Sequence, residues 1–74
     1  MSRLIRLDRS GHTTLAEWTA EDTAARERAA AAFRRELDRG MLATVSHPNG
    51  EAEVVRELPP DAELVVMRQP IAGG

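Results

Sequence analysis

Alternation of apolar and polar side chains opens the chain and predicts a strand. Residues 3–8 alternate, with Ile5 and Leu7 on the side opposite Leu4, which is the two-residue period of a strand. A polar stretch containing Gly11 follows, and residues 13–18 are rich in β-branched and aromatic side chains. Two such runs around a short glycine-containing loop predict a hairpin.

The middle of the chain predicts one amphipathic helix. Residues 20–39 are dense in Ala, Glu and Arg, which are good helix formers. We expect Thr19 to cap the first turn, with Glu21 and Asp22 at the positive end of the helix dipole. Gly40 stands where a left-handed C-terminal cap is expected. The apolar side chains recur at helical spacing and make one stripe: Ala25, Ala29, Ala32, Phe33 and Leu37.

Three further strands are expected after this helix. Residues 41–45 and 51–58 flank the sequence His47-Pro48-Asn49-Gly50, which is strong turn chemistry because Pro presets φ and Asn-Gly tolerates positive φ. Residues 63–68 form the last strand, and its run of apolar side chains on both faces is typical of a strand in the middle of a sheet. After Pro70 the chain continues as a short tail.

The element order, strand-strand-helix-strand-strand-strand, predicts an α+β fold. A helix with one apolar stripe needs a sheet face to cover. Placing the late apolar strand beside the first strand, with the helix across one face, gives a mixed sheet of the β-grasp (ubiquitin-like) type. An antiparallel meander packed on one helix is the competing arrangement. We expect one domain over residues 1–69 and a flexible tail over residues 70–74.

Composition narrows the classes of function. The chain has 74 residues, no Cys, one Trp and one Phe, so its core is small and aliphatic and leaves little room for a ligand cleft. The net charge is −2, and the ten basic residues, all Arg, are interspersed with twelve acidic ones. A nucleic-acid binder would show a basic stripe, and a membrane span needs about 18 consecutive apolar residues. We therefore expect a cytoplasmic protein that is not an enzyme and binds neither nucleic acid nor membrane.

A few isolated polar residues could suggest other chemistry. His12 and His47 lie in predicted turns without a second His or Cys at ligand spacing, so we expect solvated side chains and no metal site. Ser10 and Thr13 lie near His12, but nothing in the sequence supplies an orienting third group or an oxyanion site. Trp18 is expected in the core.

The C-terminal sequence is similar to that of known sulfur carriers. The segment Pro60-Asp61-Ala62-Glu63-Leu64-Val65-Val66-Met67, followed by Pro70-Ile71-Ala72-Gly73-Gly74, resembles the end of the molybdopterin-synthase small subunit. That family commonly finishes with an acidic turn, an apolar strand and a Pro-Val-small-Gly-Gly tail. Residues 41–45 also resemble the third strand of the sulfur carriers. Thiamine-pathway carriers and ubiquitin share the β-grasp fold and the terminal Gly-Gly.

The resemblance implies that another enzyme acts on this chain. An activating enzyme of the ThiF or ubiquitin-activating type would adenylate the Gly74 carboxylate with ATP. The adenylate would then become a thiocarboxylate for sulfur delivery or a thioester for conjugation to an amine. Gly73 would thread the enzyme's channel, with Ala72, Ile71 and Pro70 along the approach. The chain itself would bind no cofactor, and its later partners would be a sulfur-accepting synthase or a deconjugating metalloprotease.

A protein-interaction module without chemistry at the tail is the rival hypothesis. The helix covers only one sheet face, and apolar side chains on the other face would form a partner surface. Because a one-residue change of register exchanges the two faces of a strand, the sequence leaves several candidates open. They are Leu4, Leu42, Val65 and Met67. In either case we expect a monomer in the absence of partners.

Overall fold

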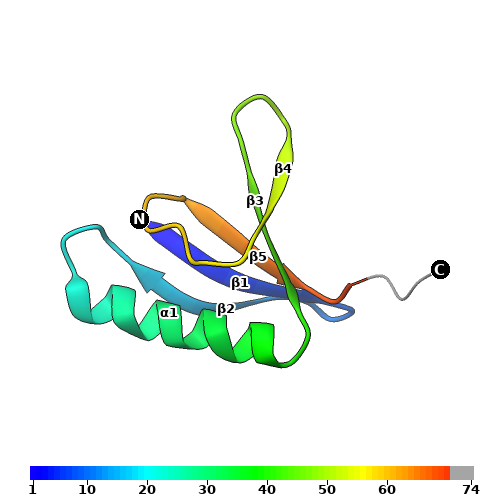
Figure 1. The fold of residues 1–74 in the computed structure, drawn as a ribbon, viewed down its shortest axis with the longest axis horizontal. Helices are drawn as coiled ribbons and strands as arrows, with labels where there is room; N and C mark the ends of the chain where they lie inside the picture. The colour runs from blue at the N-terminus through cyan, green and yellow to red at the C-terminus, as the bar shows by residue number, and fades with distance from the viewer. Residues whose placement is uncertain (71–74) are drawn as a thin grey trace.

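The computed structural model describes residues 1–70 and shows five strands with one helix packed across one face of their sheet (Figure 1). The order of elements is the predicted one, and the α+β class is confirmed. Within the described residues, no helix is long and apolar enough to cross a membrane. The elements are β1 (Ser2–Asp8), β2 (Gly11–Trp18), α1 (Thr23–Asp38), β3 (Leu42–Ser46), β4 (Ala52–Val55) and β5 (Leu64–Arg68).

The last strand, β5, lies in the middle of the sheet. The strand order is β2-β1-β5-β3-β4. β5 runs parallel to β1 and antiparallel to β3, whereas β1/β2 and β3/β4 are antiparallel pairs. The parallel pairing of the first and last strands excludes the antiparallel meander. The arrangement is a mixed sheet covered on one face by one helix, which is compatible with a β-grasp fold.

The core lies between α1 and one face of the sheet. Leu4 pairs with Val65 across β1 and β5, and both side chains are fully buried. Trp18, at the end of β2, is 2% exposed, and its indole Nε1 donates to the Pro60 carbonyl at 3.1 Å. The predicted core role of Trp18 is therefore confirmed. The helix contributes the buried side chains of its predicted stripe: Ala25, Ala29, Ala32 and Phe33.

The helix begins later than predicted. Its N-cap is Asp22, whose side chain accepts a hydrogen bond from Ala25 N at 3.0 Å, so the assignment of Thr19 as the cap was wrong. The Thr19 carbonyl instead accepts from Asp22 N at 3.1 Å, which folds the residues before the helix into a turn. At the other end Gly40 has φ 89°, as expected of a residue that follows a helix C-terminus.

A β-bulge in β2 separates its two halves. Leu4 pairs with Ala16 whereas Ile5 pairs with Thr14, so Leu15 is an extra residue in β2. A bulge of this kind changes which face the following side chains occupy. Leu15 and Ala16, although adjacent in sequence, both pack partly buried against the core.

The second hairpin is shorter than predicted. β4 covers only Ala52–Val55, whereas the sequence pattern predicted a strand over residues 51–58. The chain bends at Arg56 and Glu57, and Leu58 then packs partly buried against the core. The apolar residue that appeared to extend the strand thus contributes to the core from a loop.

Candidate functional site

The chain leaves the sheet at the end of its central strand. β5 ends at Arg68, and Gln69 and Pro70 are exposed. Of the residues expected at the activated tail, Pro70 is thus placed at the surface. Gly74, Gly73, Ala72 and Ile71 lie outside the described residues.

Three elements surround this exit. The β1–β2 turn and the C-terminal end of α1 lie at the same end of the molecule as the end of β5 (Figure 1). Together they line an open pocket of about 1060 Å³. Leu7 and Met41 are apolar side chains in its lining, and Gln69 borders it on the side where the chain departs. We call this the exit pocket.

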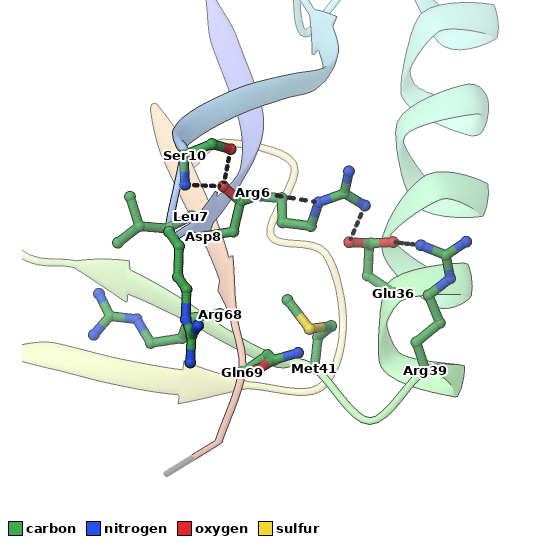
Figure 2. A pocket seen from close by; sticks show the side chains of 10 residues that line it. Arg6, Leu7, Asp8, Ser10, Glu36, Arg39, Met41, Arg68 and Gln69 are labelled. Atoms are coloured by element: carbon green, nitrogen blue, oxygen red, sulfur yellow. Dashed lines mark hydrogen bonds and ion pairs between the residues drawn. The ribbon is translucent and has the colours of Figure 1, made fainter.

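A buried carboxylate forms one wall of the exit pocket. Glu36 lies on the buried, apolar side of α1 and is only 5% exposed, although its side chain is a carboxylate. Its Oε1 atom accepts from Arg6 Nη1 of β1 at 3.2 Å, and its Oε2 atom lies 3.5 Å from Arg39 Nη1 (Figure 2). A buried charge is tolerated when it is paired and hydrogen-bonded. The pair with Arg6 joins the helix to the sheet, whereas the pair with Arg39 lies within the end of the helix.

The β1–β2 turn is held by Asp8. Its Oδ1 atom accepts hydrogen bonds from Ser10 Oγ at 2.6 Å and from Ser10 N at 2.9 Å (Figure 2). The Ser10 hydroxyl, then its backbone N–H, and less strongly the charge of Arg6 lower the pKa of Asp8, because all of them favour the ionised form. Gly11, with φ 114°, completes the turn in a conformation that favours glycine. The Ser10 hydroxyl is thus engaged by Asp8, and residues 12 and 13 are exposed.

The exit pocket carries an excess of positive charge. Four guanidinium groups line it, against two carboxylates, those of Asp8 and Glu36. Arg6 lies near both carboxylates, and Arg39 pairs with Glu36. Arg9 and Arg68 are exposed and form no ion pair within residues 1–70. The sequence pattern gave no sign of this grouping, because the residues come from three elements far apart in the chain. One signal was available: Glu36 interrupts the apolar stripe of α1.

The sheet face opposite α1 carries exposed apolar side chains. Because Val65 and Met67 of β5 are buried under the helix, the alternation of a strand places Leu64, Val66 and Arg68 on the opposite face. Arg68 pairs with Leu7 on one side and with Leu42 on the other. The large side chains exposed on this open face are Leu7 at 43%, Leu42 at 38%, Val54 at 57% and Leu64 at 38%.

Three of the four predicted partner-surface residues were assigned to the wrong face. Leu4, Val65 and Met67 are each 0% exposed, because they face α1 and form the core, so they offer no surface to a partner. Leu42 is exposed on the open face, as that hypothesis requires. Both faces of β5 are apolar, so the sequence pattern did not show which face is buried. A one-residue difference in register is enough to exchange the two faces.

The second hairpin holds the remaining histidine candidate. His47 Nε2 lies 2.8 Å from Glu53 Oε1, and both side chains are exposed. Nearby, Glu53, Asp61 and Glu63 line a second open pocket, of about 820 Å³. Within residues 1–70, no group of three or more His, Asp or Glu side chains is placed so that it could hold a metal ion.

Comparison with known proteins adds no further assignment. No family model, curated protein or solved structure matches this chain.

Proposed function

We propose that this chain is a ubiquitin-like β-grasp protein whose Gly74 carboxylate is adenylated by an activating enzyme of the ThiF or ubiquitin-activating type, in the cytoplasm. The activated tail then serves either as a thiocarboxylate sulfur carrier or as a protein modifier. One observation carries this proposal: β5 is the central strand, parallel to β1, and the chain leaves its end at exposed Gln69 and Pro70 just before the sequence Ile71-Ala72-Gly73-Gly74.

The chemistry explains why such a tail needs small residues. A carboxylate is a poor electrophile, and adenylation with ATP supplies a leaving group. The activating enzyme must admit the tail and exclude water, which would hydrolyse the intermediate. Gly73 and Gly74 present no side chain to a narrow channel and permit close backbone approach. Pro70, with its fixed φ, stiffens the start of this path.

A reconstituted activation assay tests the proposal. The full chain is incubated with a ThiF-type enzyme encoded in the same genome, ATP and labelled pyrophosphate. We expect pyrophosphate exchange with the wild-type chain and none with a chain that lacks Gly73 and Gly74. The variant Arg34→Gln changes an exposed side chain outside the exit pocket, so it serves as the control and should support exchange. Equal exchange with and without the two glycines would contradict the proposal.

Once activation is established, the fate of the adenylate separates its two branches. Addition of a sulfur donor should give a chain in which one oxygen is replaced by sulfur if the protein is a carrier. Attachment of the chain to Lys side chains of other proteins would instead identify a modifier. Because the chain contains no Lys, one copy cannot be joined to a Lys of another copy. A modifier of this kind would be attached to its target as a single copy, unless the N-terminal amine of one copy accepts the next.

The exposed apolar side chains of the open face favour a second candidate function, that of a non-catalytic interaction module. Leu7 and Leu42 flank Arg68 at the end of β5, and Leu64 lies at its start. The three expose 38–43% of their surface on this face, and exposed apolar side chains on one face often mark a partner surface. If this is the whole function, deletion of Gly73 and Gly74 leaves biological activity intact, whereas Leu42→Ser with Leu64→Ser abolishes it. The opposite pattern supports chemistry at the tail.

A further inference from the structure

The exit pocket contains two guanidinium groups that the fold itself does not use. Arg6 and Arg39 are engaged with the buried carboxylate of Glu36 at 3.2 and 3.5 Å. Arg9 and Arg68 line the same pocket, and neither forms an ion pair within residues 1–70. Arg6 and Arg39 thus stabilise the fold, whereas Arg9 and Arg68 form what we call the free pair.

Within the part of the chain that the structure describes, neither carboxylate of the exit pocket pairs with Arg9 or Arg68. Glu36 is buried and already shared between two arginines. Asp8 accepts two hydrogen bonds from Ser10 and lies 3.9 Å from Arg6 Nε. Two positive charges therefore remain in excess at the end of the sheet, in a molecule whose net charge is −2. The exit pocket is thus positively charged although the molecule as a whole is negatively charged.

The direction of α1 restricts where an anion can bind. The helix presents its C-terminal end to the pocket, with Arg39 as its C-cap. That end of a helix carries partial negative charge and disfavours anions. An anion is therefore favoured on the opposite side of the pocket, beside Arg9 and Arg68. Guanidinium groups bind carboxylate oxygens through paired hydrogen bonds.

We propose that the exit pocket binds an acidic segment of a protein partner, with carboxylates of that segment on Arg9 and Arg68. The pocket is open, and a single exposed ion pair contributes little to binding, so a ligand needs several contacts to be held. With a volume of about 1060 Å³ and apolar lining from Leu7 and Met41, the pocket suits a peptide segment better than a small free anion. This site is independent of the proposed activation of Gly74, since binding requires neither ATP nor an activating enzyme.

The test is a titration of the ¹⁵N-labelled full chain with a blocked hexaglutamate peptide, followed by amide chemical shifts. We expect saturable shifts concentrated in the β1–β2 turn and around Arg68 and Gln69. The double variant Arg9→Gln/Arg68→Gln should bind about tenfold more weakly, as the loss of two exposed charge pairs predicts. Both side chains are exposed, so the variant should keep the wild-type spectrum elsewhere.

Matched controls make each outcome decisive. The double variant Arg34→Gln/Arg56→Gln removes the same charge at exposed positions outside the pocket and should bind hexaglutamate as the wild type does. Hexalysine should produce no shifts in the pocket. Equal weakening in the two double variants would show binding by net charge alone and overturn the proposal. The proposal would also be overturned if inorganic phosphate shifted the same amide signals to saturation at the same concentration, because the site would then bind small anions.

Discussion

Glu36 is the residue whose position most shapes the end of the molecule. A carboxylate on the buried side of α1 would be unfavourable alone, but Arg6 from β1 and Arg39 from the helix terminus flank it at 3.2 and 3.5 Å. Its carbonyl also accepts from Met41 N at 3.0 Å. Glu36 therefore fixes the helix terminus, the first strand and the start of β3 relative to one another.

Replacement of Glu36 by Gln tests this role. The amide keeps the size of the side chain but leaves the Arg6 guanidinium without its buried charged partner, so we expect a loss of about 1–3 kcal/mol in the free energy of unfolding. The matched control is Arg39→Gln, which removes the partner that is 69% exposed and should cost less than about 1 kcal/mol. Urea unfolding followed by the fluorescence of Trp18 measures both. Equal small losses would contradict the assigned role of Glu36.

Asp8 predicts a pH dependence of stability with a definite sign. Its hydrogen bonds to Ser10 lower its pKa in the folded state below the ordinary value of 3.8. A group with a lowered folded pKa contributes stability that is present above the unfolded pKa and is lost as the pH falls through the folded pKa. Asp8→Asn should therefore unfold at a lower urea concentration than the wild type at neutral pH, with the difference shrinking below pH 3.8.

The same measurement with Ser10→Ala checks the cause. Because the Ser10 hydroxyl is the largest influence on the pKa of Asp8, this variant should show a reduced pH dependence, with the remainder due to the hydrogen bond from Ser10 N and to the charge of Arg6. A difference between Asp8→Asn and wild type that stays constant from neutral to strongly acid pH would contradict the explanation.

At the scale of elements, the sequence predicted what depends on local pattern. The helix stripe from Ala25 to Phe33, the turn at Asn49-Gly50 and the central position of β5 all follow from spacing and residue type. The bulge at Leu15 and the early end of β4 do not, because they are set by how side chains fit against α1. Local pattern also did not determine which face of β5 is buried, since Leu64 and Val65 are both apolar.

Two leucines of β1 test the assignment of faces. Leu4 is fully buried under α1, whereas Leu7 is 43% exposed on the open face. Leu4→Ala should destabilise the protein by about 2–5 kcal/mol, as buried leucines do. Leu7→Ala makes the same chemical change in the same strand and should cost no more than about 1 kcal/mol. Thermal or urea unfolding measures the pair, and similar losses for the two variants would show that the faces are assigned wrongly.

At the scale of the whole molecule, the fold brings together groups that the sequence keeps apart. The turn after β1, the end of α1 and the end of β5 meet where the chain leaves the sheet (Figure 1). The resemblance of the last residues to sulfur carriers predicts chemistry at this end, and the parallel β1/β5 pairing is compatible with the β-grasp fold that the resemblance implies. The free pair of the exit pocket could not be predicted, because Arg9 and Arg68 are far apart in the sequence and line the same pocket only in the folded chain.

We propose Gly74 as the reacting group of this chain. The most direct test is the intact mass, with fragmentation of the C-terminal peptide, of the full chain purified from its own cells. We predict that the chain ends at Gly74 and that a fraction carries sulfur in place of one carboxylate oxygen or is joined through Gly74 to a Lys of another protein. A chain found only with an unmodified Gly74 carboxylate, in cells that express its activating enzyme, or one that continues beyond Gly74, would contradict the account.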